Sequence, residues 1–143
     1  MADVPCVHYE CTKDTFRPDI KHPVRWVDWD QDSEIARMRW EMEPEAFREM
    51  WTGARRDGYE FCAIVNGEKL IAVAAVYRYS EDAWMLAAVS VDDPADRRQG
   101  CAKSVCSFVT AAILDAGRTA TCITRADNIP MQRTAESVGF QPV

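Results

Sequence analysis

The chain has 143 residues, of which 48% are hydrophobic and 28% are charged, and its formal net charge at pH 7 is −6. This length predicts one globular domain that buries about two-thirds of its unfolded surface in a single core. The negative charge argues against a nucleic-acid partner, because a polyanion would be repelled. No apolar stretch reaches the ~20 residues that a membrane span requires, so we expect no membrane partner either.

The first residues, MADVPCVHYE, lack the basic and apolar regions of a signal peptide, so we expect a cytoplasmic protein with reduced cysteines. Three cysteines fall on expected strand or helix core positions and are interpreted as small apolar fillers: Cys62, Cys106 and Cys122. Cys6, His8 and Cys11 could supply three metal ligands. Because no fourth ligand is evident and the spacing fits no standard zinc pattern, we expect no metal site.

Residues 1–23 are predicted to be an N-terminal extension to a domain that covers residues 24–143. The alternation over residues 4–11 allows a short edge strand, and Pro18 and Pro23 then predict an irregular crossing.

A strand is predicted over residues 24–29, followed by two short helices. Ser33 is a suitable N-cap for the first helix. Pro44 is expected to open the second helix and Gly58 to end it.

The clearest hairpin joins residues 59–65 to residues 69–79 through Asn66-Gly67, a dipeptide preferred in type I′ turns. Residues 84–91 form the third strand of this meander. The pattern then predicts a helix over about residues 100–116, a strand over 119–124 and a helix over 129–138.

Residues 96–104 combine the end of a strand, a basic glycine turn and the start of a helix. Such a turn leaves the first backbone N–H groups of the helix unpaired, near the positive end of the helix dipole, which favours an anion. Gly100 and Ala102 allow a ligand to approach the backbone, and Arg97 and Arg98 add positive charge. The alternative interpretation is a solvated helix terminus with two exposed arginines.

The R-x-x-G-x-A pattern of Arg97, Gly100 and Ala102 resembles the cofactor signature of the GNAT superfamily of N-acetyltransferases. Residues 128–140, in which an asparagine opens a short helix that closes with Gly-Phe, look like the second signature of that family. Two motifs in the right order are more specific than either one alone.

The resemblance implies an α/β fold of the α+β kind, with a mixed, mostly antiparallel sheet flanked by helices. In the family two parallel strands, here residues 84–91 and 119–124, splay apart, and the pantetheine arm of acetyl-CoA enters between them. Four apolar side chains of the helix pair belong either to the core or to an acceptor pocket: Met38, Trp40, Phe47 and Trp51. The resemblance assigns cofactor contacts to Val89, Ser90, Val91, Arg97, Arg98, Gln99, Gly100, Cys101, Ala102, Lys103 and Asn128.

The sequence departs from the family at three places, one of which is Asp92-Asp93, inserted where the strand of the family usually runs more directly into the proline, here Pro94. Ala135 stands where many members carry a tyrosine that protonates the departing thiolate, so water or another side chain must supply that proton. The chain also stops three residues after Phe140, where the family usually continues with two more strands. The strand at 119–124 would then have an open edge, and we expect residues 4–11, or a strand from a second subunit in a homodimer, to cover it.

Acetyl transfer requires a neutral amine, but an alkyl amine is protonated near pH 7 because its pKa is near the ~10.4 of lysine. A base must therefore take a proton. The resemblance implies that a backbone N–H at the end of the strand before the loop, here within residues 89–91, stabilises the carbonyl oxygen. No base is assigned, because each candidate is equally a solvated surface carboxylate. The candidates are Glu81, Asp82, Asp92, Asp93 and Glu60.

Two other chemistries are weighed at the same loop. Cys101 near a helix N-terminus would have a lowered pKa, but without a nearby histidine we do not expect it to act as a nucleophile. Lys103-Ser104 resembles the end of a phosphate-loop motif, yet the paired glycines of that motif are absent, which excludes it.

The sequence therefore predicts an N-acyltransferase that moves an acetyl group from acetyl-CoA to a primary amine of an unidentified small-molecule or peptidyl acceptor, directly in a ternary complex. The alternative is a non-catalytic module that binds CoA or acyl-CoA. Members of the family often carry a glutamate within the strand, where this sequence has the apolar residues 85–88. This difference and the missing tyrosine favour the module, whereas the intact loop and the apolar helix pair favour the enzyme.

Overall fold

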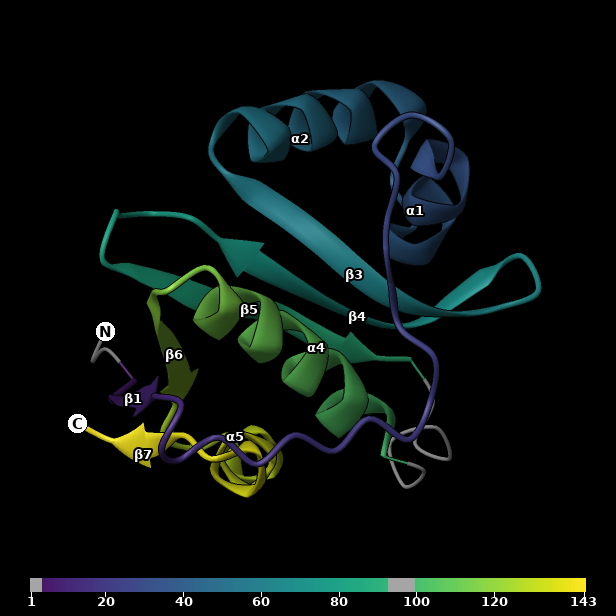
Figure 1. The fold of residues 1–143 in the computed structure, drawn as a ribbon. Coiled ribbons are helices and arrows are strands. Elements are labelled where there is room, and N and C mark those ends of the chain that lie inside the picture. Colours follow the sequence, from purple (N-terminus) through teal and green to yellow (C-terminus); the bar gives the residue numbers. More distant parts are fainter. Residues whose placement is uncertain (1–3, 93–99) are drawn as a thin grey trace.

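Within the residues that the computed structural model describes, 4–92 and 100–143, seven strands form one sheet in the order β2-β3-β4-β5-β6-β1-β7 (Figure 1). The strands are β1 (Cys6–Cys11), β2 (Arg25–Trp26), β3 (Tyr59–Asn66), β4 (Lys69–Tyr77), β5 (Ala83–Val91), β6 (Thr119–Arg125) and β7 (Gln141–Pro142). The helices are α1 (Ser33–Trp40), α2 (Pro44–Arg56), α4 (Cys101–Asp115) and α5 (Ile129–Val138). Only β5 and β6 pair in parallel among these strands, which confirms the predicted mixed, mostly antiparallel sheet.

Helices cover both faces of the sheet. On one face, α4 packs against β4 and β5 through its fully buried Val105 and Val109, and α5 joins the same core with Val138 (Figure 1). On the other face, α1 and α2 pack over β3 and β4, where Phe47 and Trp51 of α2 meet the aromatic residues of β3. The helix pair therefore covers only one half of its face.

The N-terminal strand covers the edge of β6. β1 pairs antiparallel with β6 from Cys6 opposite Arg125 to Cys11 opposite Ala120, and the short β7 pairs with the other edge of β1. The first of the two predicted ways to cover this edge is therefore confirmed, and a strand from a second subunit is not needed there. The first and last strands of the chain thus lie side by side at this edge (Figure 1).

Several predicted boundaries are wrong by a few residues. The strand predicted at 24–29 is reduced to β2, because the chain turns at Asp28, whose carboxylate accepts hydrogen bonds from the backbone of Asp30 and Gln31. Ser33 is the first residue of α1 and not its N-cap, since its hydroxyl donates to the Asp30 carbonyl.

The hairpin loop is also shifted by one residue. Asn66 pairs with Lys69, so the loop residues are Gly67 and Glu68. Of these two, only Gly67 has a positive φ, 63°, so the turn is not of the predicted type I′, which needs a positive φ at both positions. The second strand of the hairpin ends at Tyr77 and does not reach Tyr79.

Among the described residues, no helix has both the length and the apolar character needed to cross a membrane.

Candidate functional site

The start of α4 is shaped by Gly100, its N-cap residue, which has φ 80° and ψ 19°. This left-handed conformation costs a residue with a side chain about 1–2 kcal/mol. A Cβ at this position would also lie 3.3 Å from Cδ of Lys21. Glycine therefore allows the sharp turn into the helix while another segment passes close by.

The first turn of α4 offers free backbone donors. Ser104 donates its N–H to the Gly100 carbonyl at 3.0 Å, but no described residue accepts from the backbone N–H of Ala102 or Lys103. Such donors, with the positive end of the helix dipole, favour an anion. Three residues expected to grip that anion, Arg97, Arg98 and Gln99, lie outside the described residues, as does Asp93.

A segment from the N-terminal part of the chain crosses this helix start. Asp19 and Lys21 donate their backbone N–H groups to the hydroxyls of Ser107 and Ser104, each at 3.0 Å. The Asp19 carboxylate lies 3.3 Å from the Lys103 ammonium and 3.9 Å from that of Lys21. The ammonium of Lys103, predicted to hold the diphosphate, is therefore paired within the protein, and Lys21 is a further cation beside Gly100 that the sequence analysis missed.

β5 and β6 separate after a short parallel contact. Their last pair is Met85 opposite Thr121, and beyond it β5 continues to Val91 and β6 to Arg125 without pairing to each other. Ala88 has φ 53°, which is uncommon for a residue with a side chain and interrupts the regular pleat of β5. The predicted splay of the two parallel strands is therefore confirmed.

Asn128 lies just beyond the open end of this splay, three residues after β6 ends. Its Oδ1 accepts a hydrogen bond from the Met131 backbone N–H at 3.2 Å and so caps α5. No described residue accepts a hydrogen bond from its Nδ2. Because the cap fixes the orientation of the side-chain amide, this N–H group can donate to a ligand. The predicted cap is confirmed, and the predicted contact with the cofactor arm stays a prediction.

A pocket of about 450 Å³ lies at the closed end of the splay, because its lining includes Met85 and Thr121, the last parallel pair. The Thr121 hydroxyl donates to the Trp84 carbonyl at 3.3 Å, and the Tyr79 hydroxyl lies 3.0 Å from the Thr121 hydroxyl. β1 contributes His8 and Glu10 to the same pocket. From the sequence alone, His8 was weighed only as a metal ligand, and Glu10 belonged to no predicted site.

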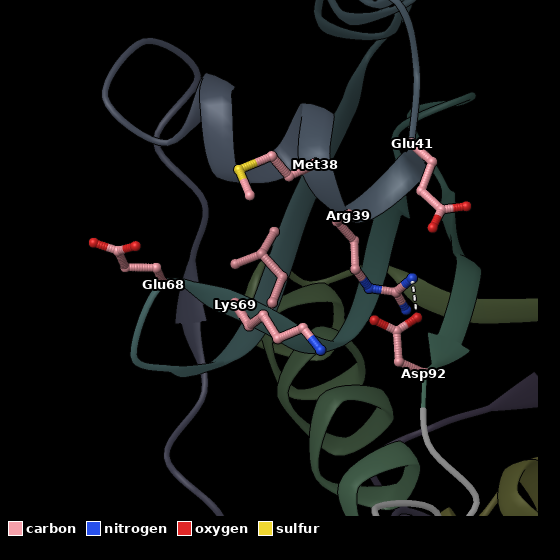
Figure 2. Close-up of a pocket in the computed structure, with 7 residues that line it drawn as sticks. Met38, Arg39, Glu41, Glu68, Lys69 and Asp92 are labelled. Carbon is pink, nitrogen blue, oxygen red and sulfur yellow. Dashed lines mark ion pairs between the residues drawn. The ribbon is translucent and has the colours of Figure 1, made fainter.

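A second pocket, of about 600 Å³, lies where the end of α1 meets the start of β4 and the end of β5. Figure 2 shows Arg39 of α1 reaching Asp92, with Lys69 of β4 beside them. Arg39 Nη1 lies 2.5 Å from Asp92 Oδ1, and Nη2 donates to Ser90 Oγ at 2.8 Å. Because Arg39 already engages both Ser90 and Asp92, these side chains support the end of β5 and are poorly placed to take a substrate proton.

A model of the acetyltransferase (GNAT) domain matches residues 15–141. The chain belongs to this family. A comparison with curated protein sequences finds no significant match.

Solved structures of other GNAT proteins share the fold. A GNAT-family protein from Novosphingobium aromaticivorans superposes with a TM-score of 0.74 at 20% identity, over 98% of this chain and 60% of that one. One from Colwellia psychrerythraea gives 0.74 at 18% identity, over 99% of this chain and 53% of that one. AAC(6')-Iy, in complex with the bisubstrate analogue CoA-S-monomethyl-acetylneamine, gives 0.64 at 16% identity, over 83% of this chain and 90% of that one. The chain thus spans little more than half the length of the first two.

The other predicted catalytic positions of the GNAT site are dispersed. Glu81 and Asp82 are exposed in the turn before β5, at the opposite end of that strand from the α4 loop. Glu60 lies 2.8 Å from an Arg78 guanidinium nitrogen. Ala135 is fully buried in the core shared by α4 and α5. None of these four lines the pocket at the closed end of the splay.

The cysteines of this GNAT domain are mostly enclosed. Burial raises the pKa of Cys62 to about 12 and that of Cys122 to about 11, and it raises the pKa of Cys106 further above its ordinary value. Their predicted role as apolar fillers is therefore confirmed. Cys101 is also buried, with 1% of its surface exposed. In the described parts of the chain, no three metal-ligating side chains gather at one point.

Proposed function

We propose that this GNAT domain transfers the acetyl group of acetyl-CoA to a primary amine, directly in a ternary complex. The observation that carries the proposal is the splay of β5 and β6 next to the start of α4, with a pocket at its closed end. The chain spans only 60% and 53% of the length of two of its structural relatives. The activity of the whole protein is therefore part of this proposal.

The residues at the start of α4 fit the diphosphate of CoA. The backbone N–H groups of Ala102 and Lys103 are available, and Gly100 has no side chain that would block them. Arg97, Arg98 and Gln99 would add contacts from the preceding loop. Charge-assisted hydrogen bonds contribute roughly 1.5–3 kcal/mol each, so a few of them suffice to hold the donor. The CoA analogue bound to AAC(6')-Iy supports a donor site in this fold.

The rest of acetyl-CoA would contact the residues at the separated ends of β5 and β6. The pantetheine arm would run along residues 89–91 toward the pocket, and Asn128 would donate its free amide N–H to that arm. A backbone N–H of β5 near the irregular Ala88 would stabilise the carbonyl oxygen as it gains negative charge. The acceptor amine would reach the thioester from the pocket side.

The first experiment measures binding and turnover together. Acetyl-CoA should raise the melting temperature, because a ligand present at 100 times its Kd stabilises the native state by about 2.7 kcal/mol. Release of CoA thiol should then depend on an added primary amine. Absence of any thermal shift at millimolar acetyl-CoA would remove the donor site, and with it the proposal.

The alternative function is a module that binds CoA without catalysis. It is favoured by Ala135, since the position that carries a tyrosine in many GNAT proteins has no proton donor here and is fully buried. A thermal shift with acetyl-CoA, but no thiol release with amines, amino acids, polyamines or peptides, would establish the module instead.

A further inference from the structure

We propose that the pocket at the closed end of the splay receives the acceptor amine and that His8, from the N-terminal strand, is the base that takes its proton. This inference rests on the proposed acetyltransferase function. It assigns a catalytic residue to β1, a strand that lies outside both sequence signatures.

The pairing of the strands places one row of side chains across the sheet. Tyr59 lies opposite Tyr77, Tyr77 opposite Met85, Met85 opposite Thr121 and Thr121 opposite Glu10. Neighbouring strands lie roughly 4.8 Å apart, so this row is continuous from β3 to β1. It crosses the sheet at the last pair before β5 and β6 separate.

His8 lies beside the separated part of β6. It is opposite Ile123, two residues beyond Thr121, where β6 no longer contacts β5. His8 and Glu10 alternate with Tyr9 and Cys11, which are buried in the core with α4, so both point to the opposite face. His8 therefore faces the pocket at the place where the thioester would end.

This face is open in front of His8. α1 packs on β4 and α2 on β3, and Arg39 of α1 reaches Ser90 near the end of β5, so the helix pair lies over the half of this face away from β6 and β1. Ile123 is 45% exposed and Tyr79 43% exposed, although both line the pocket. An acceptor can thus enter from solvent while the donor occupies the gap between the strands.

The chemistry of the lining selects a cation with an apolar body. Met85, Ile123 and the Tyr79 ring form apolar walls, and Glu10 supplies a carboxylate that attracts an ammonium group. The stacked Tyr59 and Tyr77 rings, with centroids 4.3 Å apart, continue the apolar surface away from the pocket. We therefore expect a primary monoamine attached to an apolar or aromatic group.

The groups around His8 come from β1, from the chain after β4, from β6 and from Val143, which lines the same pocket and donates its backbone N–H to the His8 carbonyl at 2.8 Å. Glu10 lies on the same face of β1, as does the exposed Cys6, and Tyr79 approaches from the chain after β4. On β6, Arg125 is paired with Asp127 at 2.9 Å, so its charge is largely compensated. A ring nitrogen of an imidazole can accept a proton from an ammonium group that binds beside it.

The proposed step is balanced in protons. The acceptor enters as R-NH3⁺, and His8 takes one proton from it and later releases that proton to solvent. The nitrogen lone pair then forms the C–N bond to the thioester carbonyl carbon as the C–S bond breaks. The second proton lost by the nitrogen ends on the departing sulfur, so the products are the N-acetyl amine, CoA-SH and one H⁺.

The test uses the full chain with phenethylamine as the acceptor probe. His8→Gln should lower kcat/KM by about 100-fold or more, the usual contribution of a general base. It should also remove the acidic limb of the pH profile, because a base acts only in its unprotonated form. The control is Lys13→Gln, in the exposed turn after β1, which should keep both rate and profile.

Two further readouts separate catalysis from folding. Imidazole in the buffer should restore turnover to His8→Ala and leave the wild type unchanged. The chain has only two histidines, so His8→Gln also assigns the imidazole C2–H signals in a proton NMR spectrum. Phenethylamine, added without acetyl-CoA, should shift the His8 signal and not that of His22.

The experiments distinguish a wrong role for His8 from a wrong acetyltransferase function. If wild-type protein acetylates an amine and His8→Gln does so equally well, the role of His8 is wrong and the acetyltransferase remains. A loss of rate without imidazole rescue and without change in the pH profile also overturns it, because that result describes a structural residue. If wild-type protein binds acetyl-CoA but acetylates no amine, the proposed function fails first.

Discussion

Arg39 shows how a single side chain joins two parts of the site. It belongs to α1, yet its guanidinium contacts Ser90 in β5 and Asp92 directly after it, and only 8% of the side chain is exposed. Its Nε is buried without a partner among the described residues, so the group is fixed by its two terminal nitrogens. α1 is thereby tied to the end of β5, directly before the residues that precede α4 in the sequence.

Replacing Arg39 with Met should lower the free energy of unfolding by about 1.5–3 kcal/mol, because hydrogen bonds to a charged group are lost. The KM for acetyl-CoA should rise, because Asp92 leads into the donor loop. Urea denaturation and thiol-release kinetics measure the two effects. Arg56→Met is the control, since that side chain is 74% exposed and its loss should change stability by less than about 0.5 kcal/mol. Equal stability losses in both variants would contradict this role of Arg39.

Gly139 is the residue at which a side chain fits least. It has φ 112°, and a Cβ there would lie 2.1 Å from the Thr15 carbonyl oxygen. The neighbouring segment cannot move away easily, since Arg17 donates its backbone N–H to the Val138 carbonyl at 2.8 Å. The end of α5 and the segment after β1 are therefore locked together at this glycine.

Gly139→Ala should lower the free energy of unfolding by about 2–4 kcal/mol, the sum of left-handed strain and overpacking. Gly117→Ala is a matched control, because Gly117 has φ 80° and a Cβ added there would meet no atom within 4 Å. It should lose only the roughly 1–2 kcal/mol of backbone strain. Equal losses in urea denaturation would show that the contact with Thr15 does not matter.

At the scale of the elements, the local structure could be predicted from the sequence and the long-range pairing could not. α5 has the predicted bounds because its Asn128 cap and its C-terminal Gly139 are local signals. The alternation of residues 4–11 indicated a strand but gave no partner. β6 comes from the opposite end of the chain, so only its open edge suggested the pairing.

In the candidate site, too, the local features could be predicted from the sequence and the long-range contacts could not. The glycine turn before α4 was predictable, because a helix start and its free N–H groups are encoded within a few residues. Lys103 with Asp19, Arg39 with Asp92 and His8 beside the splay all depend on segments that meet only in the folded chain. Their charges were visible in the sequence, but their partners were not.

β1 should be necessary to protect β6. Ala126 donates its N–H to the Pro5 carbonyl, so by antiparallel alternation the backbone of Val7 also hydrogen-bonds to β6. Val7→Pro removes that donor and should lower the free energy of unfolding by about 1–2 kcal/mol. The exposed edge of β6 should then promote self-association, measured by size-exclusion chromatography with light scattering.

The control for this strand is Val4→Pro, since Val4 is 40% exposed and precedes β1. It should remain as stable as the wild type and keep the same elution volume. A Val7→Pro variant that behaves in the same way would mean that β1 does not hold the edge of β6.

At the scale of the whole molecule, the buried thiols make stability depend on alkaline pH. Burial raises the pKa of Cys62 to about 12 and that of Cys122 to about 11, and it also raises the pKa values of Cys11 and Cys106. A thiol in the unfolded chain loses its proton near pH 8.5. Above that pH the unfolded state therefore binds fewer protons than the native state, and the free energy of unfolding must fall as pH rises.

The wild-type free energy of unfolding should decrease between pH 8.5 and 10 by up to about 1.4 kcal/mol per pH unit for each buried thiol. Replacing Cys62 and Cys122 together with Ala should lower stability at pH 7, because small contacts are lost, but should make the pH dependence less steep. Urea denaturation at pH 7, 8.5 and 10 measures both effects. Replacement of the exposed Cys6 with Ala should leave the steepness unchanged. The free energy of unfolding of the double variant and of the wild type could instead fall with the same slope as pH rises. Cys62 and Cys122 would then ionise as readily in the native state as in the unfolded state, which would contradict their burial in the core.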